Sequence, residues 1–138
     1  MADAQQIRKP VPRPSPESAL FWEGAKEKSL MVPRCESCGR FWFPPSQRCR
    51  HCLSPDFAWR EVSGAGRIYS FVVFHRVYHP AFEADVPYVV AIVELDEGPR
   101  LLSNIVGAPP EDVRCDMRVR VVFEERDGVT IPQFAILR

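Results

Sequence analysis

Four cysteines fall into two matched pairs, Cys35-Glu-Ser-Cys38 and Cys49-Arg-His-Cys52, with ten residues between the pairs. Each C-x-x-C turn directs two sulfurs toward one point, and two such turns supply the four thiolates that a tetrahedral zinc ion takes. The gap is shorter than in the usual two-pair zinc pattern, and it fits a compact ribbon in which a β-hairpin separates the turns. The spacing therefore predicts that all four cysteines bind one metal ion.

The predicted metal site is closed, because protein sulfur fills all four ligand positions, and closed sites of this kind are structural. The same four-thiolate geometry also binds iron and carries electrons, but nothing else in the sequence indicates a redox chain. Structural Zn²⁺ is therefore the predicted cofactor, with iron as the less favoured alternative. Zn²⁺ with four thiolates carries a net charge of about −2, which neighbouring basic residues such as Arg34 and Arg40 can offset.

The fifth cysteine and the N-terminal residues indicate in which cellular compartment the protein is expected. Cys115 leaves an odd number of cysteines, which argues against a full disulfide framework. Residues 1–13 are polar and proline-bearing, without the apolar core of a secretory signal, and no apolar run is long enough to cross a bilayer. We therefore expect a cytoplasmic protein with no membrane partner, in a reducing compartment where paired cysteines favour metal over disulfide.

The length of 138 residues suffices for one ordinary domain, or for a small domain with a metal-stapled appendage. We expect a mobile arm and an N-terminal helix over residues 1–29, a zinc ribbon over 30–60 and a barrel over 61–138. The helix is predicted from Pro16 to about residue 28, with Ser15 as its N-cap and an interruption or end near Gly24.

The region after the cysteines changes to strand-like patterns rich in β-branched and aromatic residues. Strands are predicted over residues 66–77, 88–95, 100–106, 118–124 and 130–137. Five short strands with tight turns and one long loop fit a five-stranded barrel of the OB type, whereas a sandwich normally needs about seven strands. The predicted fold class is therefore mainly β, with an N-terminal helix, a zinc ribbon and a five-stranded OB-fold barrel.

Catalytic motifs are missing from the sequence. There is no G-x-S-x-G, no glycine-rich phosphate loop and no H-E-x-x-H, and the three histidines, His51, His75 and His79, stand without a paired nucleophile. We therefore predict no catalytic residues, and the chain does not form a complete enzyme by itself.

An ordered set of short motifs resembles the acyl-CoA-associated zinc-ribbon/OB-fold family, long called a domain of unknown function. The matching motifs, which cover nearly all of the chain from Pro16 onward, are Phe21-Trp22-Glu23-Gly24, Cys35-x-x-Cys38-Gly39, Phe43-Pro44-Pro45, Cys49-x-x-Cys52, Gly64-x-Gly66, Pro87-Tyr88-Val89-Val90, Glu94-Leu95-Asp96-Glu97-Gly98 and Pro132-Gln133-Phe134. One departure stands out: where the family commonly has a glycine before the fourth strand, this chain has Arg114-Cys115-Asp116.

The resemblance implies a rubredoxin-like zinc ribbon and an accessory role. Members of the family look like subunits of thiolase-fold enzymes: thiolases, acetyltransferases and steroid side-chain aldolases of lipid, steroid or aromatic degradation. The partner does the chemistry, and the small subunit buttresses it and helps to shape the acyl-CoA channel. Because thiolase-fold partners are usually dimeric, the resemblance implies a heterotetramer of two small and two large chains.

Candidate partner-binding residues are the aromatic side chains of the helix and of the ribbon: Phe21, Trp22, Phe41, Trp42 and Phe43. Buried aromatic anchors would dominate the binding energy of such an interface. The alternative is that the same side chains pack the helix and the ribbon onto their own barrel.

Candidate acyl-CoA contacts are the basic residues at and after the first barrel strand: Arg67, His75, Arg76 and His79. Arginine suits phosphate groups, and the loop over residues 75–87 would cover a ligand. The alternative function is a single-stranded nucleic-acid module that uses Tyr69, Phe71, Phe74 and Arg76, but zero net charge gives it little electrostatic attraction.

Overall fold

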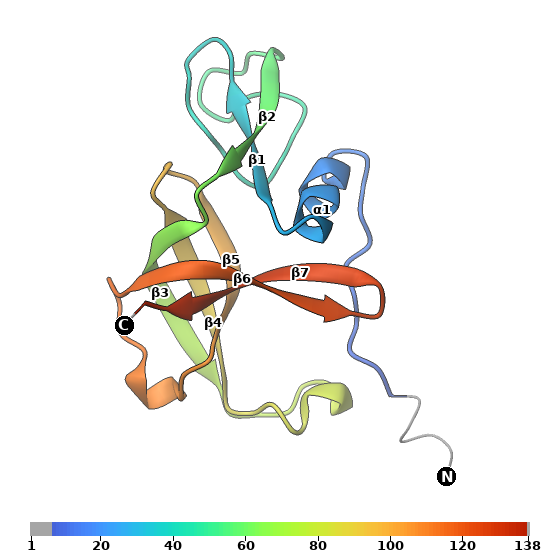
Figure 1. The fold of residues 1–138 in the computed structure, drawn as a ribbon, viewed down its shortest axis with the longest axis vertical. Helices are drawn as coiled ribbons and strands as arrows, with labels where there is room; N and C mark the ends of the chain where they lie inside the picture. Colours follow the sequence, from blue (N-terminus) through green and yellow to red (C-terminus); the bar gives the residue numbers. More distant parts are fainter. Residues whose placement is uncertain (1–6, 138) are drawn as a thin grey trace.

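The computed structural model describes residues 7–137 and sets a two-stranded ribbon beside a closed five-stranded barrel (Figure 1). One N-terminal helix lies between the two. This mainly β architecture confirms the predicted fold class. Residues 1–6 of the predicted mobile arm lie outside the described residues. Further along this arm, Lys9 pairs with Asp85 and lies over the ring of Phe82.

Helix α1 spans Ala19–Lys26 and is shorter than predicted. Ser15 does not cap it, because the hydroxyls of Ser15 and Ser18 bond to each other at 3.0 Å and each also accepts the other residue's backbone N–H. These bonds hold residues 16–18 in a turn that delays the helix start. The helix ends at Lys26, two residues after Gly24, which agrees with the predicted end near that glycine. It buries Phe21 and Ala25 against the rest of the fold.

The ribbon is built on strands β1 (Leu30–Cys35) and β2 (Phe57–Val62), which pair antiparallel over their full length. The two cysteine turns lie in the long connection between these strands. After the first turn the chain comes back alongside β1, where Phe41 forms a β-bridge with Arg34 across that turn. The prediction of a hairpin between the cysteine pairs was wrong: residues 39–48 form no hairpin of their own, because Phe41 pairs back with β1 instead.

The barrel contains the five predicted strands with small changes at their ends: β3 (Ala65–Phe74), β4 (Tyr88–Leu95), β5 (Arg100–Val106), β6 (Arg118–Arg126) and β7 (Val129–Ile136). Around the barrel the order is β3-β4-β5-β7-β6. Antiparallel pairing of β3 with β6 and a short parallel pairing of β5 with β7 close it. Two 3₁₀ helices, η2 (Pro80–Phe82) and η3 (Pro110–Asp112), lie in the loops.

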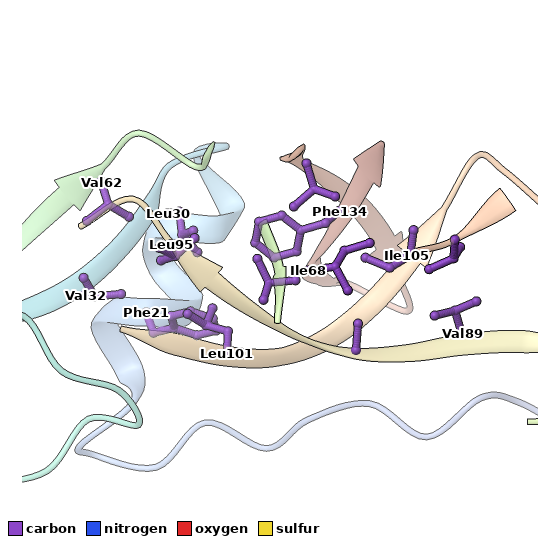
Figure 2. Close-up of a cluster of buried hydrophobic side chains, with 14 residues drawn as sticks. Phe21, Leu30, Val32, Val62, Ile68, Val89, Leu95, Leu101, Ile105 and Phe134 are labelled. Atoms are coloured by element: carbon purple, nitrogen blue, oxygen red, sulfur yellow. The ribbon is translucent and has the colours of Figure 1, made fainter. Parts of the chain in front are cut away.

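One hydrophobic core joins the helix, the ribbon and the barrel (Figure 2). Phe21 of α1 and Leu30 of β1 lie in the same buried cluster as Ile68 and Phe134 of the barrel. Because burial of apolar area stabilises by about 25 cal/mol per Å², this shared cluster holds the three parts together. None of the helices in residues 7–137 is both long enough and apolar enough to span a membrane.

Gly66 is expected to be required where β3 passes β4, because a Cβ there would lie 2.4 Å from the backbone oxygen of Glu94. We predict that Gly66→Ala destabilises the chain by about 1–3 kcal/mol, as overpacking does. Gly24→Ala is the comparison variant: its Cβ would lie 2.5 Å from Met31 Cγ and 3.1 Å from the backbone oxygen of Ser29, so a side chain must shift, but alanine favours the helix and we expect a smaller loss than at Gly66. Chemical denaturation of both variants checks this. Equal stability of the two would contradict the prediction.

Candidate metal centre

The four predicted ligands converge. The sulfurs of Cys35, Cys38, Cys49 and Cys52 all lie within 4.8 Å of one another. The Sγ atoms of Cys35 and Cys52 are 3.5 Å apart, and those of Cys38 and Cys49 are 3.7 Å apart. A tetrahedral ion with Zn–S bonds of about 2.3 Å needs sulfurs separated by about 3.8 Å. The arrangement therefore fits zinc, whereas a disulfide would need a separation of about 2.05 Å.

Backbone N–H groups prepare the sulfurs for a cation. The N–H groups of Ser37 and Cys38 reach Cys35 Sγ at 3.3 and 3.4 Å, and the N–H of His51 reaches Cys49 Sγ at 3.2 Å. The N–H of Cys38, opposed by burial and aided by Ser37, lowers the pKa of the Cys35 thiol to about 6. Thiolates are the form that binds metal, so Cys35 is ready to bind at neutral pH.

Crowding of the sulfurs has the opposite effect at Cys52. Although the backbone N–H of Ser54 lowers its pKa, the neighbouring Cys35 sulfur and burial raise the pKa of Cys52 to about 11. A proton shared among close sulfurs relieves their repulsion, and a divalent cation does the same more completely. The donor set thus suits a structural Zn²⁺ held by four thiolates, which closes the coordination shell.

A second group of contacts fixes the outer side of the cysteine turns. His51 Nε2 lies 3.2 Å from the backbone oxygen of Phe41, so this nitrogen donates its proton to the carbonyl. The other ring nitrogen, Nδ1, then faces Arg40 Nη1 at 3.5 Å. Arg34 Nε donates to the backbone oxygen of Gly39 at 3.0 Å. The His51 bond ties the second cysteine turn to the segment that follows the first, and the Arg34 bond closes the first turn.

The predicted partner-binding aromatics divide into two groups. Phe21 and Trp42 are buried, with 6% and 2% of their surface exposed, so they pack their own chain as the alternative prediction held. Trp42 lies against Phe57 in the ribbon, next to the buried ligands. The side chains of Trp22, Phe41 and Phe43 are half-buried against the main core, and their role at an interface stays a prediction.

The predicted acyl-CoA contacts are not brought together as one site. Arg67 pairs with Glu94 and Asp116, and His79 accepts the N–H of Ala81 at the start of η2. His75 and Arg76 lie exposed in the loop after β3. Arg67 and His79 are thus held by their own chain while His75 and Arg76 are exposed, and the acyl-CoA assignment stays a prediction for all four residues.

Sequence reasoning missed the contacts that close the barrel. Ser103 of β5 donates to the backbone oxygen of Pro132 of β7 at 3.0 Å, and Gln133 donates to Asn104 at 3.4 Å. These side chains join β5 to β7 beside their short backbone pairing. The motif Pro132-Gln133-Phe134 is visible in the sequence. Its role in joining β7 to β5 could not be predicted, because its partners lie about thirty residues earlier in the chain.

Where the chain departs from the family that it resembles, Asp116 adopts a left-handed backbone with φ of 71°. This conformation favours glycine, and aspartate is among the residues that tolerate it best. Its carboxylate also pairs with Arg67. The local turn therefore forms without glycine.

Comparison with known proteins gives matches along most of the chain. Residues 22–58 match a family model described as the rubredoxin-like zinc ribbon domain of ChsH2. Residues 59–124 match the model of the C-terminal OB-fold domain of ChsH2. A solved structure described as "Ltp2-ChsH2(DUF35) aldolase" contains a chain that is 40% identical with a TM-score of 0.82, over 91% of this chain and 98% of that one.

Two relatives differ in length. A probable enoyl-CoA hydratase alpha subunit of Thermomonospora curvata is 41% identical over 91% of this chain, which spans 39% of that relative's length. A DUF35 domain-containing scaffold protein of Methanocaldococcus jannaschii is 39% identical over 78% of both chains. The module therefore matches both a protein close to its own size and part of a longer one.

We predict that Cys35→Ser abolishes zinc binding and unfolds the ribbon, because zinc binding in such sites is itself folding free energy. Cys115→Ser is the matched control, since Cys115 is exposed and outside the cluster. Zinc content by metal analysis should fall from about one ion per chain toward zero in the first variant alone, with loss of soluble protein. A well-folded, zinc-free Cys35→Ser protein would contradict the structural role.

Zinc affinity is predicted to rise with pH. Because Cys52 has a pKa raised to about 11, its thiol carries a proton at neutral pH that zinc must displace. The logarithm of the apparent association constant should therefore increase between pH 6 and 8, by at least about one per pH unit. A chelator competition series, corrected for protonation of the chelator, measures this. A flat profile would show that the sulfurs are already deprotonated.

Proposed function

Because this chain belongs to the ChsH2 zinc-ribbon and OB-fold (DUF35) family, we propose that it is a non-catalytic accessory subunit of a thiolase-fold acyl-CoA enzyme. The partner would be a thiolase, an acetyltransferase or a steroid side-chain aldolase. The observation that carries the proposal is the close match to a chain of the Ltp2-ChsH2(DUF35) aldolase, over almost the whole length of both chains. The relative described as a scaffold protein supports the same role.

Several histidine and carboxylate side chains that could act as a catalytic acid or base are bonded to groups of their own chain, which supports a scaffold role. His51 and His79 are engaged by backbone groups of their own chain. Three carboxylates of the β4–β5 turn region are likewise engaged: Glu94 with Arg67 and Arg100, Asp96 with Arg118, and Glu97 with the N–H of Ser63. A general acid or base needs a free group within reach of a substrate, so these residues serve the fold.

The outer face of the barrel gives little support to the alternative function, a module that binds single-stranded nucleic acid. Tyr69 is partly exposed there, and the guanidinium groups of Arg67 and Arg100 lie 5.8 and 3.8 Å from its ring centre. Both arginines pair with Glu94. A strand-binding groove needs positive charge along its path, and here that charge is offset.

The proposed location is the cytoplasm. All five cysteines are free of disulfides, and four of them are arranged for a metal ion. A reducing compartment keeps such thiols available for zinc.

Co-expression with thiolase-fold enzymes encoded beside this chain tests the proposal. We expect the two chains to co-purify and to elute together as a complex of two small and two large subunits. Activity toward acyl-CoA thioesters should depend on the large chain's nucleophile and fall when the small chain is left out.

Hydrogen exchange of the complex then tests the predicted partner surface. If the half-buried aromatics form it, exchange should slow in Ala19–Lys26 and around residues 41–43, while exposed segments far from them, such as the 75–87 loop, serve as the internal control. Protection confined to that loop would place the interface elsewhere. Failure to form a complex with any thiolase-fold chain would overturn the proposed function.

A further inference from the structure

A cavity of about 430 Å³ lies where the ribbon meets the β4–β5 turn of the barrel. Its ribbon side includes two arginines and a histidine, Arg34, Arg40 and His51, together with Gly39 and Phe41. Its barrel side is the turn at Glu97 and Gly98. The cavity therefore brings basic side chains of both cysteine turns to one place.

The two arginines in this cavity belong to the cationic residues that form no ion pair with a carboxylate in the part of the chain that the structure describes; about half of the others form one. In the described residues, neither Arg34 nor Arg40 lies within 4.0 Å of a carboxylate. Arginines and lysines elsewhere do form such pairs: Arg8, Lys9, Lys28, Arg60, Arg67, Arg100, Arg118 and Arg126. The one acidic residue in the lining, Glu97, accepts the backbone N–H of Ser63 at 2.8 Å. The lining thus carries two full positive charges against one negative charge.

Neutral contacts hold both guanidinium groups in place. Arg34 is fixed by its bond to Gly39 and lies 5.9 Å from the ring centre of Phe41. Arg40 Nη1 lies 3.5 Å from His51 Nδ1, a long contact, and the other ring nitrogen of His51 lies 3.2 Å from the Phe41 carbonyl oxygen. Each guanidinium group has five N–H donors and has spent one of them here. Several donors therefore remain for a ligand without rearrangement.

These arginines help to offset the charge of the thiolate site, but the contacts to the sulfurs do not use their N–H groups. Backbone N–H groups of Ser37, Cys38 and His51 make the contacts to the sulfurs, while the fixed donors of Arg34 and Arg40 are bonded to Gly39 and His51. Gly39 has φ of 76°, and a Cβ there would lie 3.4 Å from Arg34 Nη2. The first cysteine turn therefore leaves room beside the guanidinium group.

We propose that the cavity between Arg34, Arg40 and His51 binds a phosphate group of a nucleotide-type ligand. Planar guanidinium groups match phosphate oxygens with paired hydrogen bonds, and fixed donors lose less entropy on binding than mobile ones. The phosphate could come from the nucleotide end of a coenzyme A thioester or from a free nucleotide. The site is formed by this chain alone, so the inference does not depend on the proposed partner.

Calorimetry with the zinc-loaded full chain at low salt tests the site, with pyrophosphate, ADP, coenzyme A and pantetheine as the probes. We expect the three phosphate-bearing probes to bind and pantetheine, which has no phosphate, not to bind. Tighter binding of coenzyme A than of ADP would identify the thioester carrier as the source, and equal binding would identify the phosphate alone. Binding of pantetheine as tight as that of coenzyme A would overturn the proposal.

Two glutamine variants separate this site from general charge attraction. Arg40→Gln should weaken binding of coenzyme A about tenfold or more, because it removes hydrogen bonds between charged groups. Arg50→Gln removes the same charge from an exposed position in the second cysteine turn outside the cavity lining, and it should change affinity less than about twofold. Zinc analysis of both variants confirms that the ribbon is intact. Equal weakening by both, or no binding by the parent chain, would overturn the proposal.

Discussion

The convergence of four sulfurs on one point is the constraint on which the ribbon depends. The ribbon has little hydrophobic core of its own: Trp42 and two of the ligands, with Phe57 beside them. Such a small cluster cannot offset the entropy lost by ordering the long connection between β1 and β2. The metal supplies the missing stabilisation, and it does so only when both cysteine turns are in place.

The ribbon in turn completes the core of the rest of the chain. Leu30 and Val32 of β1 lie in one cluster with Phe21 of the helix and Leu95 of the barrel (Figure 2). The turn after β4 reinforces this joint, because Glu97 accepts the N–H of Ser63 at the end of β2. Metal, helix and barrel are therefore linked, so loss of zinc should be felt beyond the cysteines. This linkage suits a subunit whose proposed task is to present a fixed surface to a larger enzyme.

Much of the fold could be predicted because its signals are local. Alternating β-branched and aromatic residues located all five barrel strands to within a few residues, and the cysteine spacing identified the ligands. The helix start was wrong because Ser15 and Ser18 satisfy each other rather than the helix. Which aromatic side chains are buried in their own chain could not be predicted from the sequence. Neighbours such as Trp42 and Phe43 pack in different hydrophobic clusters, and only the folded chain decides this.

The sequence by itself determined the metal ligands, the strands and the family, because each rests on residue types at short spacing. Tertiary structure decided which charges and rings remain available to a partner or ligand. Arg67 and Arg34 look alike in the sequence, yet the first faces Glu94 from a strand 27 residues away and the second faces an open cavity. Charge pairing depends on distance in space, and only the folded chain sets that distance.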